Sequence, residues 1–251
     1  DDKKISLNFH KDVFTIGRSD EIKTLEENAR KGINTIITGD IGVGKSHLLD
    51  SFQTDKKILK INDLSGLKGT LKELLIFLYD NDKKHVKELM YGDIDHDKMV
   101  LKMNRSSTKN LCDEIKKIVD DKEYILTIDR VDSITPGGVQ FLEEIKDTFV
   151  IFCTARTVKL DRSSFMWNYD RLVLNPLNRP RSFELINKIS YDLNPEDFDL
   201  FRNHIYEQSN GNPRVIFEVI DRYRKEPVIT NEVIREIRHT ASLKEIDMTF
   251  I

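Results

Sequence analysis

Residues 39–46 read Gly39-Asp40-Ile41-Gly42-Val43-Gly44-Lys45-Ser46. This octapeptide satisfies the pattern G-x-x-x-x-G-K-[ST] in full. Its glycines let the backbone curl so that successive N–H groups converge on phosphate oxygens. The lysine adds a positive charge near the outer phosphates, and the serine hydroxyl can ligate magnesium. The stretch therefore predicts a phosphate-binding loop, with His47 as a further contact, whereas an ordinary glycine-rich turn is the alternative.

The sequence on either side of the loop supports this interpretation. Residues 34–38, Asn-Thr-Ile-Ile-Thr, form a short β-branched run that is typical of a buried strand. After the loop comes an apolar stretch with helical spacing that carries Leu48, Leu49 and Phe52. A helix that begins near Lys45 would direct its positive end toward a bound anion. We therefore expect strand, loop and helix in succession.

The same alternation of short strands and longer helices continues along the chain. Further strands are predicted by the apolar runs at residues 58–61, 124–128, 149–153 and 172–174. Apolar stripes with helical spacing lie at residues 21–31, 67–78, 111–119 and 139–145. Strands that alternate with helices predict an α/β fold, here a three-layer arrangement with a parallel five-stranded sheet covered on both faces.

The pattern becomes purely helical after Pro176. Helical stripes lie at residues 183–189, 198–205, 215–223 and 233–237. Asn194-Pro195 and Asn212-Pro213 each combine an Asn cap with Pro at the first helical position, which predicts the start of a helix. We therefore expect an α/β domain at residues 1–177 and a small all-helical domain at residues 178–251.

A carboxylate follows one of the predicted strands. Asp129 ends the run Tyr124-Ile125-Leu126-Thr127-Ile128-Asp129. At the carboxyl end of a strand beside a phosphate loop, such an Asp can hold magnesium directly or through water. Hydrolysis also needs a group that orients or deprotonates the attacking water. Asp132 is our candidate for that group, and a turn or capping carboxylate is the equally supported alternative.

Composition limits the classes of protein. The chain has 251 residues, 39% of them hydrophobic and 33% charged, and a formal net charge of −3. This balance favours a globular protein over a general polyanion binder, but it leaves room for a local basic face. Basic clusters that could contact a phosphate backbone lie at residues 83–85, 98–105 and 222–225, and a solvated surface balanced by nearby acids is the alternative for each. No apolar run approaches the roughly 18 residues that a membrane helix needs. Cys112, expected in the core, and Cys153 match no metal or redox spacing, so we expect a reduced, cytoplasmic setting without membrane contact. Trp167 is expected to pack near the fifth strand.

Three further motifs resemble those of AAA+ ATPases related to archaeal and eukaryotic replication initiators and to the STAND-type archaeal ATPases. Residues 14–21, Phe-Thr-Ile-Gly-Arg-Ser-Asp-Glu, with Leu25, resemble the opening F-x-G-R-x-x-E-x-x-x-L. Residues 149–156, Phe-Val-Ile-Phe-Cys-Thr-Ala-Arg, resemble the sensor-1 strand. Residues 211–214, Gly-Asn-Pro-Arg, resemble the sensor-2 turn at the start of a lid helix. The resemblance spans about residues 13 to 225.

The resemblance implies a set of roles around ATP and Mg²⁺. In this family the opening segment packs beside the adenine, which implies contacts from Phe14, Ile16, Gly17 and Arg18. The sensor-1 polar residue would be Thr154, facing the γ-phosphate. The lid turn would bring Pro213 and Arg214 to the nucleotide. The expected ligands of the magnesium ion are Ser46 and Asp129.

Two features of the sequence concern catalysis: the residue after Asp129 and the candidates for an arginine finger. The family commonly places a Glu directly after the strand Asp, whereas this chain has Arg130, so slow hydrolysis or use of ATP as a binding switch is consistent with the sequence. A neighbouring subunit usually supplies an arginine finger, which can contribute roughly 10³ to 10⁵ in rate. Arg162 lies where that residue would fall, and Arg171 is the second candidate.

The resemblance implies an ATPase that acts as an ATP-controlled assembly factor on DNA, of the replication-initiator, helicase-loader or transposition-regulator type. It implies a homo-oligomer, as a ring or filament, that contacts DNA through the ATPase core, with other replication or mobile-element proteins as partners. One alternative is a STAND-type nucleotide switch that acts through protein partners. A small-molecule kinase is a third interpretation, which the Gly-Arg opening and the lid turn disfavour.

Overall fold

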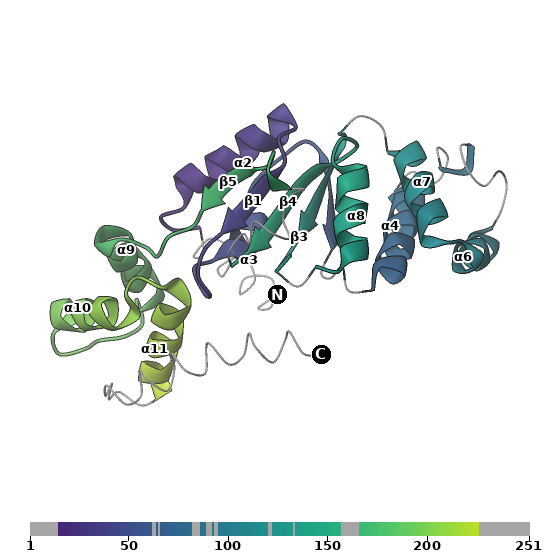
Figure 1. The fold of residues 1–251 in the computed structure, drawn as a ribbon. Coiled ribbons are helices and arrows are strands. Elements are labelled where there is room, and N and C mark those ends of the chain that lie inside the picture. Colours follow the sequence, from purple (N-terminus) through teal and green to yellow (C-terminus); the bar gives the residue numbers. More distant parts are fainter. Residues whose placement is uncertain are drawn as a thin grey trace. The chain divides into compact units, whose positions relative to one another are not determined.

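The fold is taken from a computed structural model, shown as a ribbon in Figure 1. The residues that it describes are 15–61, 64, 66–81, 86–88, 92, 95–119, 122–132, 134–156 and 166–225. Phe14, Arg162 and the helix expected at 233–237 lie outside these ranges.

In the described part of the chain, five strands form one sheet: β1 (Thr35–Thr38), β2 (Lys57–Ile61), β3 (Tyr124–Ile128), β4 (Val150–Ala155) and β5 (Asp170–Val173). Their order is β2-β3-β4-β1-β5. β3 pairs in parallel with β2, from Tyr124 opposite Lys57 to Ile128 opposite Ile61, and with β4 on its other side. Every residue of β3 and β4 is buried, which explains their continuous apolar sequences. The parallel five-stranded α/β fold predicted from the sequence is confirmed.

Helices connect and flank the strands. In chain order they are α2 (Ser19–Lys31), α3 (Lys45–Leu49), α4 (Leu67–Asn81), α6 (His96–Arg105), α7 (Thr108–Ile118), α8 (Pro136–Ile145), α9 (Arg179–Ile189), α10 (Phe198–Ser209) and α11 (Pro213–Lys225). α3 ends before Phe52 and is shorter than expected. α6 was not predicted as a helix, because its many charged residues leave only Met99 and Met103 as a buried stripe.

The capping residues explain where several helices begin. Asn212 caps α11 as predicted, because its Oδ1 accepts hydrogen bonds from the N–H groups of Arg214 and Val215. The helix start predicted at Asn194-Pro195 is wrong. α10 begins four residues after Asn194, where the Oδ1 of Asp197 accepts the N–H of Leu200 at 2.9 Å. The side-chain cap of Asp197 therefore decides the start.

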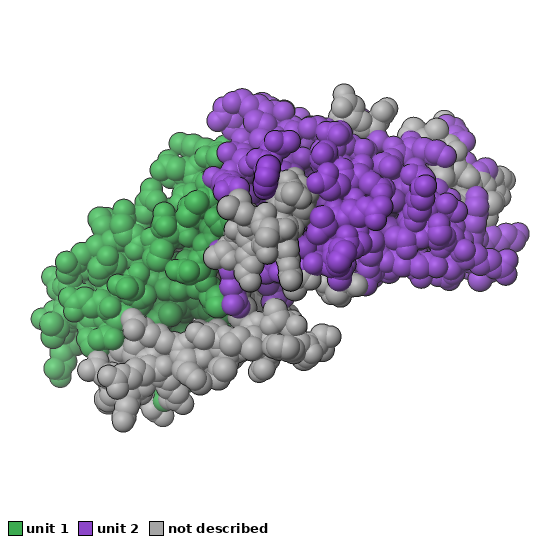
Figure 2. Space-filling model, in the orientation of Figure 1, with its two compact units in different colours: residues 1–25, 37–53, 172–251 green, residues 26–36, 54–171 purple. Residues whose placement is uncertain are grey.

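The chain divides into two compact units, which are coloured separately in Figure 2. The first unit comprises residues 1–25, 37–53 and 172–251, and the second comprises residues 26–36 and 54–171. α2, β1 and β5 each contribute residues to both units.

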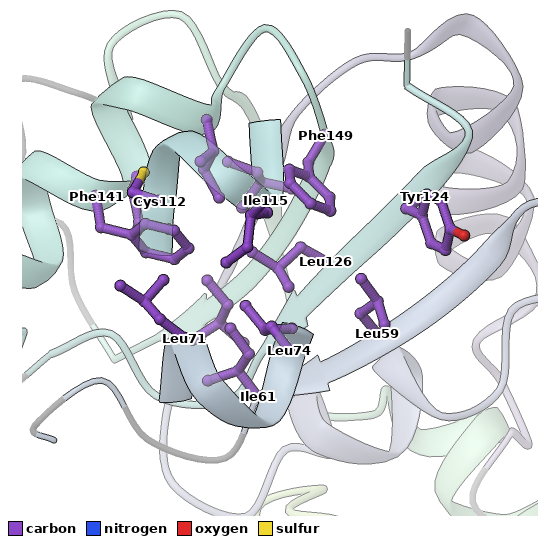
Figure 3. Close-up of a cluster of buried hydrophobic side chains, with 14 of the residues drawn as sticks. Leu59, Ile61, Leu71, Leu74, Cys112, Ile115, Tyr124, Leu126, Phe141 and Phe149 are labelled. Carbon is purple, nitrogen blue, oxygen red and sulfur yellow. The ribbon is translucent and has the colours of Figure 1, made fainter. Parts of the chain in front are cut away.

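The second unit has a core of aliphatic and aromatic side chains. Leu59 and Ile61 of β2, Leu126 of β3, Leu71 of α4 and Phe141 of α8 belong to it (Figure 3). α4 packs against both α7 and α6. The helices that follow β2 and β3 thus bury their apolar stripes against the strands, which is the packing that their periodicity predicts.

The first unit has a helical core of its own. α9, α10 and α11 pack against one another around Leu185, Ile205, Ile216 and Ile220, which are all buried. Phe201 and Tyr223 add an aromatic contact, with ring centroids 4.8 Å apart. The C-terminal part is therefore helical, as predicted from residue 178 onward.

Several single residues complete the comparison with the sequence. Cys112 is buried in the core as expected, and burial, together with a hydrogen bond to Glu144, raises the pKa of its thiol to about 12. Trp167 is 65% exposed, so its prediction as a packing residue is wrong. Across the described ranges, we find no helix with the length and apolar character needed to cross a membrane.

The position of Leu126 gives a test of this core. Leu126 is fully buried at the centre of β3, so Leu126→Ala should lower the free energy of unfolding by about 2 to 5 kcal/mol. The matched control is Leu101→Ala, at a leucine that is 56% exposed, which should change it by less than about 0.5 kcal/mol. Urea unfolding followed by circular dichroism measures both. Equal effects of the two substitutions would contradict the assigned burial.

Candidate functional site

The loop at residues 39–46 has a backbone that favours glycine at three of its positions, and at two of these, Gly39 and Gly42, a side chain would also clash. Gly39 has φ 151° and Gly42 has φ 81°. A Cβ at Gly39 would lie 2.3 Å from the carbonyl oxygen of Leu174, and a Cβ at Gly42 would lie 2.7 Å from Oδ1 of Asn212. The chain therefore passes too close to its neighbours for a side chain at either position. Of the two glycines that the pattern requires, Gly39 is thus constrained by close approach and Gly44 by its φ of 101° alone.

The loop's carbonyl groups are hydrogen-bonded by protein donors from several directions. Nζ of Lys45 donates to the oxygens of Gly39 at 2.7 Å and Asp40 at 2.9 Å. The remaining acceptors, with their donors, are Ile41 O with Asn212 Nδ2 at 2.7 Å, Gly42 O with Arg214 N at 3.3 Å, Val43 O with Arg18 at 3.1 Å and Gly44 O with Leu48 N at 3.0 Å. Every carbonyl from residue 39 to residue 44 thus has a donor.

This arrangement fixes where the loop's N–H groups point. In a planar trans peptide the N–H of one residue points opposite to the carbonyl of the residue before it. Because the carbonyls of Ile41 and Val43 point to Asn212 and Arg18, the amides of Gly42 and Gly44 point away from these donors. The amide of Val43 instead donates to Asp40 O at 3.5 Å, within the loop. A Cβ at Gly44 would meet no atom of the described residues within 4 Å, so there is open space at this point of the loop. Amides on one side of a curled loop form an anion-binding surface.

Lys45 and the short helix α3 follow the loop. The Lys45 side chain is only 9% exposed and curves back over the loop, so its positive charge lies at the carbonyls of Gly39 and Asp40. Ser46 is half-buried in the first turn of α3, and His47 is exposed beside it. Because α3 has only five residues, its dipole adds little, and the loop amides are the main donors for an anion.

Arg18 is a buried residue that links two segments of the chain, and it is not exposed for contact with a ligand. Its guanidinium is almost completely buried and donates to the carbonyl oxygens of Val43 and Asn175 and to the carboxylate of Glu21. Burial lowers the pKa of Arg18, and the hydrogen bond that Arg18 donates to Glu21 opposes this shift. Arg18 therefore joins the phosphate loop to the chain that leads into α9, a role that its sequence motif does not reveal.

The segment before Arg18 lies against the C-terminal helices. Ile16 packs against the core of α9–α11. Gly17 has φ 69°, and a Cβ there would lie 2.8 Å from Cδ of Arg181 in α9. Nη2 of Arg181 in turn lies 3.2 Å from the carboxylate of Asp20. The opening motif is thus held between the loop and the helical part, as is expected of residues that surround a ligand.

The turn at residues 211–214 is hydrogen-bonded to the loop. Asn212 connects the two, because its Oδ1 caps α11 while its Nδ2 donates to Ile41 O. Pro213 is buried at the first position of the helix. Nε of Arg214 pairs with Glu218 at 3.2 Å, while the Arg214 backbone N–H bonds to Gly42 O. The sequence identified Arg214 in this turn, but it missed Asn212 as a direct partner of the loop.

The second unit contains a cluster around Asp129, the residue that follows β3. The hydroxyl of Thr154, fully buried in β4, donates to Oδ1 of Asp129 at 2.6 Å. The same hydroxyl accepts the backbone N–H of Arg130 at 2.8 Å. Thr154 therefore holds the Asp129 carboxylate in a fixed orientation at the end of the strand. These two residues, predicted separately from sequence, lie in direct contact.

The turn after Asp129 has an unusual backbone. Arg130 has φ 60°, which is uncommon for a residue other than glycine. Asp132 is exposed, and its Oδ1 accepts the N–H of Arg156 at 2.7 Å. Asp132 thus performs the turn-stabilising role that was one of its two interpretations. Arg171, the second candidate for the arginine finger, is exposed on β5.

The candidate magnesium ligands come from different parts of the chain. Ser46 belongs to the first unit and Asp129 to the second. Both offer the oxygen atoms that magnesium prefers. Among the described residues there is no group of three His, Cys, Asp or Glu side chains that could bind a metal ion by itself.

Asn212 can be tested by two substitutions. Asn212→Asp keeps the cap of α11 but removes the donor to Ile41 O, so the free energy of unfolding should fall by about 1 kcal/mol. Asn212→Ala removes the cap as well, and the loss should reach about 2 kcal/mol. Urea unfolding of both variants measures the difference. If the Asp variant is as stable as the wild-type chain, the bond to the loop contributes nothing to stability.

No family model matches the chain. Among solved structures, the chain is similar to a Walker-type ATPase of Pyrococcus abyssi, with a TM-score of 0.67 and 16% identity over 94% of this chain and 76% of that one. It is also similar to a STAND protein with a tetratricopeptide-repeat sensor from Pyrococcus horikoshii, with a TM-score of 0.56 and 18% identity over 90% of this chain and 32% of that one. The chain therefore has the fold of the AAA+ P-loop ATPases.

Proposed function

We propose that this chain binds Mg-ATP at the loop of residues 39–46 and is an ATPase whose nucleotide state controls assembly on DNA. The observation that supports nucleotide binding most directly is the loop itself. The carbonyls of Ile41 and Val43 are held by protein donors, so the amides of Gly42 and Gly44 point away from those donors. Nζ of Lys45 contacts the carbonyls of Gly39 and Asp40, and in this proposal it exchanges these contacts for the outer phosphates. This donor set suits a chain of phosphates.

The proposed roles follow from the chemistry of each side chain. Lys45 stabilises negative charge on the outer phosphates. Ser46 and Asp129 supply oxygen ligands for Mg²⁺, which when bound neutralises charge on the β- and γ-phosphates. Thr154 orients the Asp129 carboxylate through their 2.6 Å hydrogen bond. The adenine side is assigned to the segment that contains Ile16 and Gly17, and Phe14 is assigned there from the motif alone.

Hydrolysis is expected to be slow. Arg130 occupies the position where a Glu would activate water, and an arginine cannot act as a base because it stays protonated. Asp132 is the remaining candidate for the group that activates water, but its carboxylate already accepts the N–H of Arg156. Arg162 remains our proposed finger from a neighbouring subunit. ATP is therefore proposed to act chiefly through binding.

The turn at residues 211–214 could couple nucleotide binding to the association of subunits. We assign residues 1–177 to the nucleotide-binding domain and residues 178–251 to a helical lid, because α9–α11 have their own core. Asn212 and Arg214 bond to loop carbonyls, so a shift of the loop on binding phosphate would be transmitted to α11. Such a lid can control how copies of the chain associate as a ring or filament.

A STAND-type switch that acts through protein partners is the second candidate. Arg130 and the engaged Asp132 favour it, because a switch needs binding more than turnover. The solved STAND structure has the same fold, and this chain spans 32% of it. DNA binding that requires ATP and weakens with salt would support the first candidate. ATP-dependent association without DNA binding would support the second.

Lys45→Ala tests the nucleotide site. Mg-ATP at about 100 times its dissociation constant should stabilise the wild-type chain by roughly 2.7 kcal/mol. The variant should lose this stabilisation, because the charge at the outer phosphates is gone. Thermal unfolding with and without Mg-ATP measures the shift, and circular dichroism verifies that the variant is folded. A variant with an unchanged shift would refute the assignment of Lys45.

Arg130→Glu tests the catalytic deficit. A carboxylate at this position should increase phosphate release by up to about 10²-fold, because a general base becomes available. Arg130→Gln is the control, since it removes the same positive charge without adding a base. Equal rates for the Glu and Gln variants would show that base catalysis is not what limits turnover.

A further inference from the structure

A basic groove lies in the second unit, away from the residues assigned above. It has a volume of about 430 Å³ and is open to solvent. Its lining residues come from α6, from the first turn of α7 and from the link between the two helices: Lys98, Leu101, Lys102, Arg105, Ser106 and Asn110. We call this surface the α6 groove. Three of its six lining residues are basic and none is acidic, although the whole chain has a net charge of −3.

The spacing of the basic residues places them in one row. Lys98, Lys102 and Arg105 follow one another at four and three residues along α6, so they project from the same side of the helix. With about 1.5 Å of rise per residue, they are separated by about 6 and 4.5 Å along the axis. A strand of B-DNA carries one phosphate about every 3.4 Å of helix axis, so this row of roughly 10 Å spans about three phosphates, one for each basic side chain.

Two lysines of α4, which are not among the residues that line the groove, also contact α6. Nζ of Lys68 donates to Asn104 O at 3.1 Å, and Nζ of Lys72 donates to Asn104 Oδ1 at 2.8 Å. Neutral acceptors hold these two lysines against α6, so their positive charge is not cancelled there. The ion pair of Lys98 with Asp95 is long, at 3.5 Å, and both side chains are well exposed. Such a pair is weak and can exchange for a phosphate.

The groove fits a nucleic-acid backbone better than other anionic partners. A membrane surface would require α6 to insert an apolar face, but Met99 and Met103 are already buried in the core. Asn110 adds a side-chain amide of the kind that commonly donates to phosphate oxygens, whereas the Ser106 hydroxyl already donates to Lys102 O at 3.0 Å. A row of cations beside a neutral donor is the composition of a backbone contact, which positions nucleic acid without reading its sequence.

We propose that the α6 groove binds the sugar-phosphate backbone of a nucleic acid strand through Lys98, Lys102 and Arg105. This inference rests on the DNA-directed part of the proposed function and gives it a location. It is independent of the phosphate loop. The groove therefore requires no nucleotide for its own contacts, although ATP-driven assembly would place several grooves along one strand.

The test measures fluorescence anisotropy of labelled duplex DNA and of single-stranded DNA and RNA of the same sequence. Wild-type chain should bind with an affinity that falls steeply between roughly 50 and 200 mM salt. The triple variant Lys98→Glu, Lys102→Glu, Arg105→Glu should bind at least tenfold more weakly. A second triple variant with Gln at these positions should reduce the salt slope on duplex DNA by about 2.7, because three phosphate contacts are lost.

The matched control reverses three exposed basic residues outside the groove: Lys23, Arg30 and Lys188, each replaced by Glu. It has the same net charge as the first variant and should retain wild-type affinity for nucleic acid. Affinity lost equally in both variants would mean a general charge effect and would overturn the groove. No binding by the wild-type chain, with or without Mg-ATP, would overturn it too, as would equal competition by polyglutamate.

The thermal shift with Mg-ATP is measured on the same samples. It should persist in both groove variants, because neither changes the phosphate loop. Nucleic-acid binding without any Mg-ATP shift in the wild-type chain would contradict the nucleotide site but support the groove. A normal Mg-ATP shift without nucleic-acid binding would contradict the groove alone.

Discussion

The structure depends on how one strand-to-helix loop satisfies its carbonyl groups. Residues 39–44 have the backbone of neither a strand nor a regular helix, so their carbonyls need donors from elsewhere. Lys45, Arg18, Asn212 and the backbone of Arg214 supply most of them. Because the carbonyls of Ile41 and Val43 are held by Asn212 and Arg18, the amides of Gly42 and Gly44 point away from these donors. The anion-binding surface that we propose would therefore result from ordinary hydrogen-bond satisfaction.

The same bonds link the loop to the rest of the first unit. Arg18 connects Val43 with Asn175, which precedes α9, and Asn212 connects Ile41 with the start of α11. A buried carbonyl that loses its donor costs about 1 to 3 kcal/mol, so the loop and the helices are expected to move together. In the second unit, Thr154 gives Asp129 a comparable constraint. Such constrained groups favour binding of a ligand in one fixed geometry. Arg130 cannot act as the base that hydrolysis would need, because it stays protonated.

Much of the fold could be predicted from local sequence. The β-branched runs of β1 and β3 and the stripe of α4 have the periodicities that their burial requires. The helix start predicted at Asn194-Pro195 is wrong because Asp197 provides the cap instead. α6 was not predicted, because only two of its residues are buried. The hydrogen bonds of Arg18 could not be predicted from the sequence, since its partners Val43 and Asn175 are 25 and 157 residues away. Periodicity reports burial, whereas such long-range bonds depend on the completed fold.

The most direct measurement is an NMR titration of chain labelled with ¹⁵N in glycine. Mg-ATP should move the amide resonances of Gly42 and Gly44, because their N–H groups lie on the side of the loop opposite to the held carbonyls. Gly69 in α4 and Gly137 in α8 should not move, since they lie in helices of the other unit. If the loop glycines stay unchanged at saturating Mg-ATP, the loop does not bind the phosphates.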